Sequence, residues 1–144
     1  MANDKSLPAK LIAIVLIIIT VSLFSYWGYQ CVNYVLGQIF HVDTGSSLYD
    51  LFIGLIAMAA SVPLFIGSIW VFRNKPATTL IVYGTIGFLI KNVLDIINDA
   101  YPLTKLTTVM ASDISAAAWL IGIDFLQLAF WIAVWVYFAK HYKK

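Results

Sequence analysis

The stretch LIAIVLIIITVSLFSYWGYQCVNYVLGQIF, from Leu11 to Phe40, contains no charged residue and decides the fold class. A transmembrane helix needs about 20 predominantly apolar residues, so this run is long enough to cross a bilayer. Three more apolar runs follow it along the chain. We expect spans over about residues 11–38, 49–72, 77–98 and 113–138. The predicted fold is all-α: an antiparallel bundle of four transmembrane helices, forming a single membrane domain over residues 1–144.

The composition of the whole chain agrees with an integral membrane protein. Of its 144 residues, 62% are hydrophobic and only 11% are charged, whereas about a quarter of the residues in an average soluble domain are charged. A soluble domain this small has too little interior to bury so much apolar surface. Nine basic residues against seven acidic ones form no basic face, which excludes a nucleic-acid partner and leaves the lipid bilayer as the first partner.

Local signals place the ends of the spans. Ser47 to Asp50 has the pattern of a capping box that opens the second span, and Pro63 lies inside that span. The basic stretch Arg73 to Pro76 predicts a tight loop before the third span. The longest connection is expected over Asp99 to Ser112, before the fourth span.

Each predicted span carries one stripe of small or polar residues at helical spacing. The stripes are Ser22, Ser25, Tyr29 and Asn33 on the first span; Asp50, Gly54, Ala57, Ser61 and Ser68 on the second; Gly84, Gly87, Lys91, Asp95 and Asn98 on the third; and Ser115, Ala118, Gly122, Ala129 and Ala133 on the fourth. Because small residues let membrane helices approach closely, we expect these stripes to form the interior of the bundle. The alternative is that the stripe of the fourth span is a dimer face.

Three ionisable residues within the spans are the most informative for function: Lys91, Asp95 and Asp124. A charge at the bilayer centre costs about 2.5–3.5 kcal/mol, so it is seldom kept without a partner or a task. If Ala77 and Phe138 mark one membrane boundary, Lys91 and Asp124 both lie about 21 Å above it. This predicts a contact between Lys91 and Asp124, while Asp95 is one helical turn from Lys91.

Two carboxylates with one lysine leave one negative charge, which a proton, a cation or a ligand amine could neutralise. We expect Asp95 to line a shallow polar pocket that opens to the outer side and is bounded by Tyr29, Asn33 and Asn98. Two simpler alternatives are a purely structural ion pair and charges that extend to the membrane surface.

Several chemistries lack the residues they need. His41 and His141 lie outside the spans, Cys31 is the only cysteine, and no HExxH spacing occurs. We therefore expect no catalytic residue, no metal site and no cofactor. An aspartyl dyad of Asp95 and Asp124 stays an open alternative, although the nearby lysine favours two ionised carboxylates over a shared proton.

The function expected from these observations is non-enzymatic. The first hypothesis is a small membrane protein, such as an accessory subunit, that binds a partner protein or a small ligand within the bilayer through its polar cluster. The second is a small proton- or cation-coupled transporter or ion-pathway component. Transport usually requires two related halves, and the sequence contains no internal repeat, so this alternative implies a homodimer.

The distribution of lysine and arginine predicts the orientation in the membrane. Seven of the nine fall at the end that holds both termini, namely Lys5, Lys10, Arg73, Lys75, Lys140, Lys143 and Lys144. Lys105 is the only one at the other end, and Lys91 lies within a span. We therefore expect a multi-pass protein of the bacterial inner membrane with both termini in the cytoplasm.

Reporter fusions test this orientation. A reporter that is active only in the cytoplasm should give signal when it is fused after Lys144, and none when it is inserted between Asp99 and Ser112. The reverse pattern would overturn the predicted topology.

Overall fold

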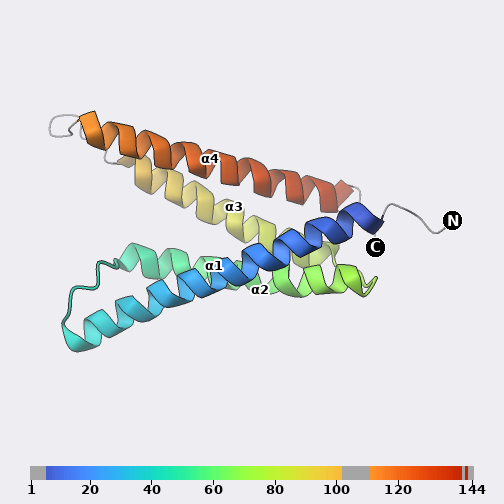
Figure 1. Cartoon of the computed structure of the whole chain (residues 1–144), viewed down its shortest axis with the longest axis horizontal. Coiled ribbons are helices and arrows are strands. Elements are labelled where there is room, and N and C mark those ends of the chain that lie inside the picture. Colours follow the sequence, from blue (N-terminus) through green and yellow to red (C-terminus); the bar gives the residue numbers. More distant parts are fainter. Residues whose placement is uncertain (1–5, 102–110, 141, 143–144) are drawn as a thin grey trace.

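The computed structural model describes residues 6–101, 111–140 and 142, and this part of the chain contains four α-helices and no strand. The helices are α1 (Ser6–Phe40), α2 (Leu48–Phe72), α3 (Thr78–Ala100) and α4 (Ala111–Lys140) (Figure 1). All four are long and apolar enough to cross a membrane. The four predicted helices are therefore confirmed, although α1 and α4 extend beyond the expected bounds. Most of the connection expected over Asp99 to Ser112 lies outside the described residues.

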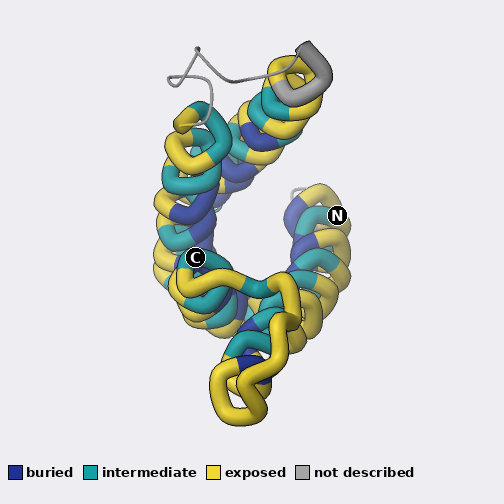
Figure 2. The backbone as a smooth tube through the Cα atoms, turned by 90° about the vertical axis from the view of Figure 1, so that its left-hand side faces the viewer, coloured by how far each residue is buried: buried dark blue, intermediate teal, exposed yellow. Residues whose placement is uncertain are grey.

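The four helices pack in the order of the sequence: α1 on α2, α2 on α3, and α3 on α4. No other pair of these helices has Cα atoms within 8 Å of each other. Seen from one end of the molecule, the chain follows an open curve and not a closed ring (Figure 2). The antiparallel arrangement is therefore formed as expected, but α1 and α4 make no backbone contact.

The start of α2 follows its predicted capping box. The backbone N–H of Asp50 donates to Ser47 Oγ over 3.1 Å, and the backbone N–H of Ser47 donates to Asp50 Oδ2 over 2.7 Å. These two bonds satisfy backbone donors that the first helical turn leaves free. The helix then runs through Pro63 without ending.

Glycine residues let α3 approach α2 closely. A Cβ atom added at Gly84 would overlap Leu64 and lie 2.8 Å from the carbonyl oxygen of Ala60, and one added at Gly87 would lie 2.6 Å from Ala60 Cβ. The small residues of the α2 stripe, Gly54, Ala57, Ser61 and Ser68, are also buried, and Gly54 lies against Trp27 and Cys31 of α1. The serines among them are satisfied, since Ser61 donates to its own helix over 2.7 Å. The expected interior stripes of the second and third spans are thus confirmed for their small residues.

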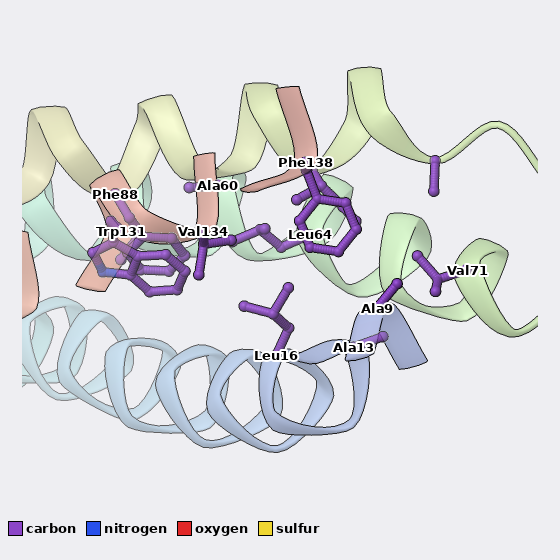
Figure 3. Packing of buried hydrophobic residues seen from close by; sticks show 13 residues of the cluster. Ala9, Ala13, Leu16, Ala60, Leu64, Val71, Phe88, Trp131, Val134 and Phe138 are labelled. Atoms are coloured by element: carbon purple, nitrogen blue, oxygen red, sulfur yellow. The ribbon is translucent and has the colours of Figure 1, made fainter. Parts of the chain in front are cut away.

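The apolar core lies toward the end of the molecule that holds the termini. It combines Ala9, Ala13 and Leu16 of α1, Leu64 and Val71 of α2, Phe88 of α3, and Trp131, Val134 and Phe138 of α4 (Figure 3). The rings of Phe88 and Trp131 are stacked, with centroids 4.5 Å apart and planes 7° from parallel. Below them, Thr78 Oγ1 donates to the backbone carbonyl of Tyr142 over 2.7 Å. These two contacts fix α4 against α3.

The other two predicted interior stripes are wrong for most of their residues, which are exposed, whereas Asn33 of the first stripe is half-buried. Ser22, Ser25 and Tyr29 of α1 are exposed, and so are all five stripe residues of α4, Ser115, Ala118, Gly122, Ala129 and Ala133. Each of these helices has one neighbour only and buries a different face. A hydroxyl group can also donate to its own helix, as Thr20 does to the Leu16 carbonyl over 2.7 Å. Serine in a membrane helix therefore does not require an inward position.

Two glycine substitutions test the α2–α3 contact. Gly84→Ala should destabilise the protein by about 1–3 kcal/mol, because the added methyl group has no space. Gly122→Ala is the matched control, since nothing lies within 4 Å of its added Cβ. It should be neutral or slightly stabilising because alanine favours a helix over glycine by about 1 kcal/mol. Thermal unfolding in one detergent measures both variants, and equal effects would contradict the close approach.

Candidate functional site

A buried ion pair lies on α3, away from the apolar core. The ammonium group of Lys91 contacts the carboxylate of Asp95 one helical turn later, and the two side chains are only 8% and 15% exposed. The sequence indicated this i, i+4 neighbourhood. In surroundings this apolar, an ion pair is stable only if further groups satisfy its remaining donors and acceptors.

Two aromatic residues supply those groups. The hydroxyl of Tyr49, in the first turn of α2, donates to Asp95 Oδ1 over 2.9 Å. The Lys91 Nζ atom lies 5.2 Å from the ring centroid of Trp27 on α1, which is a cation–π distance. The ion pair therefore ties α1, α2 and α3 together at one point. Neither aromatic residue was among the predicted site residues.

Asp124 of α4 lies in the same region as the ion pair of Lys91 and Asp95. Its side chain is buried and lies close enough to Asp95, Asp99 and Lys91 for their charges to act on it. The expected contact between Lys91 and Asp124 is not formed: Lys91 with Asp95 is the only ion pair within 4.0 Å in the described part of the chain. Asp99 was expected in the connection before the fourth span, but it belongs to the last turn of α3.

The register of α3 and α4 explains this correction. The depth estimate set Ala77 level with Phe138, but Thr78 is hydrogen-bonded to Tyr142, about one turn further along the chain. The stacking of Phe88 on Trp131 has the same offset. A shift of about four residues moves Asp124 by roughly 6 Å along the axis. It moves Asp124 away from Lys91 and toward Asp95 and Asp99.

Asn92 is the polar residue in this region that has no partner. Its side chain is fully buried, and neither its Nδ2 nor its Oδ1 atom has a hydrogen-bond partner in the structure. It lies one turn beyond Phe88, which stacks on α4, so it faces α4 and lies below Asp99 on the same side of α3. A buried amide without a partner costs about 1–3 kcal/mol per polar atom. Such a cost suggests that something else hydrogen-bonds to it.

The other predicted site residues lie elsewhere. Tyr29 is 63% exposed on the outer face of α1. Asn33 is near the α1–α2 loop, where its backbone carbonyl accepts a hydrogen bond of 3.2 Å from Thr44 Oγ1. Asn98 is exposed near the end of α3. The pocket expected between these three residues and Asp95 is therefore not formed as predicted.

Three carboxyl groups thus share a small region with one lysine. We call Asp95, Asp99 and Asp124, together with Lys91 and Asn92, the acidic site. If all three carboxyl groups were ionised, it would carry a net charge of −2. No group of three or more His, Cys, Asp or Glu side chains in the described part of the chain is arranged to hold a metal ion.

Double-mutant cycles test which carboxylate is the partner of Lys91. Lys91→Met combined with Asp95→Leu should show a coupling energy of about 0.5–3 kcal/mol, which is typical of residues in contact. Lys91→Met combined with Asp124→Leu should show a smaller coupling. The free energy of unfolding in detergent is the measured quantity, and a larger coupling to Asp124 would contradict the register described above.

Comparison with protein-family models, with curated proteins and with solved structures finds no match to this chain. The chemistry of the acidic site is therefore the basis for assigning a function. Its features are an excess of carboxyl groups, a buried amide without a partner, and a position between helices in the apolar part of the chain.

Proposed function

We propose that this chain is a small, non-enzymatic, multi-pass membrane protein that binds a small cationic ligand within the bilayer at the acidic site. The orientation expected from the lysine and arginine residues, with both termini in the cytoplasm, is part of this proposal. The bacterial inner membrane is the proposed location. The ligand is a proton, a small inorganic cation or the ammonium group of a small molecule.

The observation that carries the proposal is the unpartnered amide of Asn92 beside an excess of carboxyl groups. Carboxylates within a membrane are costly unless a positive charge compensates them. Lys91 forms its ion pair with Asp95. Neither Asp99 nor Asp124 forms an ion pair within the described part of the chain. An ammonium group or a hydrated cation would balance the negative charge of these two residues and donate a hydrogen bond to the Asn92 amide oxygen.

Proton-coupled transport is the second candidate function. It is supported by the two carboxyl groups of Asp99 and Asp124, which have no lysine or arginine partner in the described part of the chain, because a carboxyl group in such a position can take up and release a proton. Transport would need a second copy of the chain. The outward-facing small residues of α4 provide a surface on which another helix could pack closely.

Ligand-dependent stability tests cation binding. Methylammonium should raise the thermal stability of the purified protein, by about 2.7 kcal/mol when its concentration is 100 times the dissociation constant. Asp124→Asn and Asn92→Leu should remove this effect. Asp43→Asn, in the exposed loop after α1, is the matched control and should keep it. The neutral solute acetamide should have no effect on any variant.

The same measurement is repeated with sodium, with potassium and across pH 5 to 8. If no cation and no change of pH alters stability in a way that depends on Asp124, the proposal is wrong. If methylammonium also drives proton efflux from liposomes that contain the protein, transport replaces simple binding as the preferred function.

A further inference from the structure

An apolar groove of about 440 Å³ lies between α1 and α4, the two helices that make no backbone contact. Leu11, Ile12 and Val15 line it from α1, and Phe130, Ala133 and Tyr137 line it from α4. Figure 3 shows the adjoining core, where Leu16 lies across from Val134. The groove is separate from the acidic site.

The position of the groove along the helices matches one leaflet of a bilayer. Its lining on α4, from Phe130 to Tyr137, covers about 10 Å of helix. One leaflet contributes about 15 Å of a hydrocarbon core that is about 30 Å thick. The groove begins close to the end of the molecule that holds the termini and does not continue along the whole of α1 and α4.

A positive charge lies beside the groove, at the end of the molecule where α4 ends. Lys140 is exposed and follows Tyr137 and Ala133 on one stripe of α4, so it stands at the mouth of the groove. Among the described residues, Lys10, Arg73 and Lys75 lie at the same end of the molecule as Lys140. A headgroup next to Lys140 would therefore be anionic.

The geometry points to a binding site for an anionic phospholipid, with one acyl chain in the groove between α1 and α4 and the phosphate group at Lys140. A transmembrane helix of a partner or of a second copy would cross both leaflets and bury apolar surface along about 30 Å. An acyl chain spans one leaflet, as the groove does. The site is independent of the cation proposed above.

Lipid binding can be measured by native mass spectrometry of the full chain in detergent. Phosphatidylglycerol and phosphatidylcholine with identical acyl chains are the anionic and zwitterionic probes. We expect the protein to bind phosphatidylglycerol about fivefold more tightly, the preference that one lysine at the membrane surface provides. Lys140→Gln should abolish this preference. Lys10→Gln is the matched control, because Lys10 lies at a similar depth on the other side of α1 from the groove.

A second pair of variants tests the groove itself. Ala133→Leu should weaken the binding of both lipids together, because the larger side chain fills the space of the acyl chain. Ala118→Leu, on an exposed part of α4 remote from the groove, should leave both affinities unchanged. The thermal stability of each variant checks that it remains folded.

Three outcomes would overturn the proposal. The first is equal affinity for the two lipids. The second is an equal loss of preference in Lys140→Gln and Lys10→Gln, which would indicate nonspecific attraction. The third is a change from dimer to monomer in Ala133→Leu with no change in lipid binding, which would assign the groove to a second copy of the chain.

Discussion

The contact of Gly84 with Ala60 and Leu64 fixes the register of α2 against α3, and the position of the polar residues depends on it. With no side chain at Gly84, the backbones approach closely enough that α3 passes directly over Ala60 and Leu64 of α2. In this register the first turn of α2 lies beside the outer part of α3, and Tyr49 reaches Asp95. A slip of one turn, about 5.4 Å, would separate this hydroxyl from the carboxylate and leave the ion pair with one partner fewer.

The sequence predicted those parts of the fold that depend on the bilayer alone. The four long helices follow from apolar length, and the start of α2 follows from the side chains of Ser47 and Asp50. The stripes of α2 and α3 were predicted correctly because these helices have neighbours on two sides, so their small residues meet other backbones. The stripes of α1 and α4 were misassigned because an end helix has one neighbour, and its small residues also occur on the free face.

The acidic site was predicted in part. Charge within the spans was enough to single out Lys91, Asp95 and Asp124. Their pairing depended on the offset between α3 and α4, which is set by the stacking of Phe88 on Trp131 and cannot be read from span boundaries. Tyr49 and Trp27 were missed for a related reason. Aromatic residues near the ends of spans are typical of the membrane interface, and only tertiary packing shows that these two turn toward a buried charge.

The packing of each helix on its neighbour in the sequence has a consequence for how the chain folds. Contacts between helices that are adjacent along the chain are local, and a fold dominated by local contacts forms rapidly and with few alternatives. The α1–α2 hairpin can form before α3 has entered the membrane, and α4 can add to a three-helix unit that is already in place. The contact of Trp27 with Lys91 is different, because it joins helices that are not consecutive. It can form only after α3 has inserted, so it is the last of these contacts to form among the first three helices.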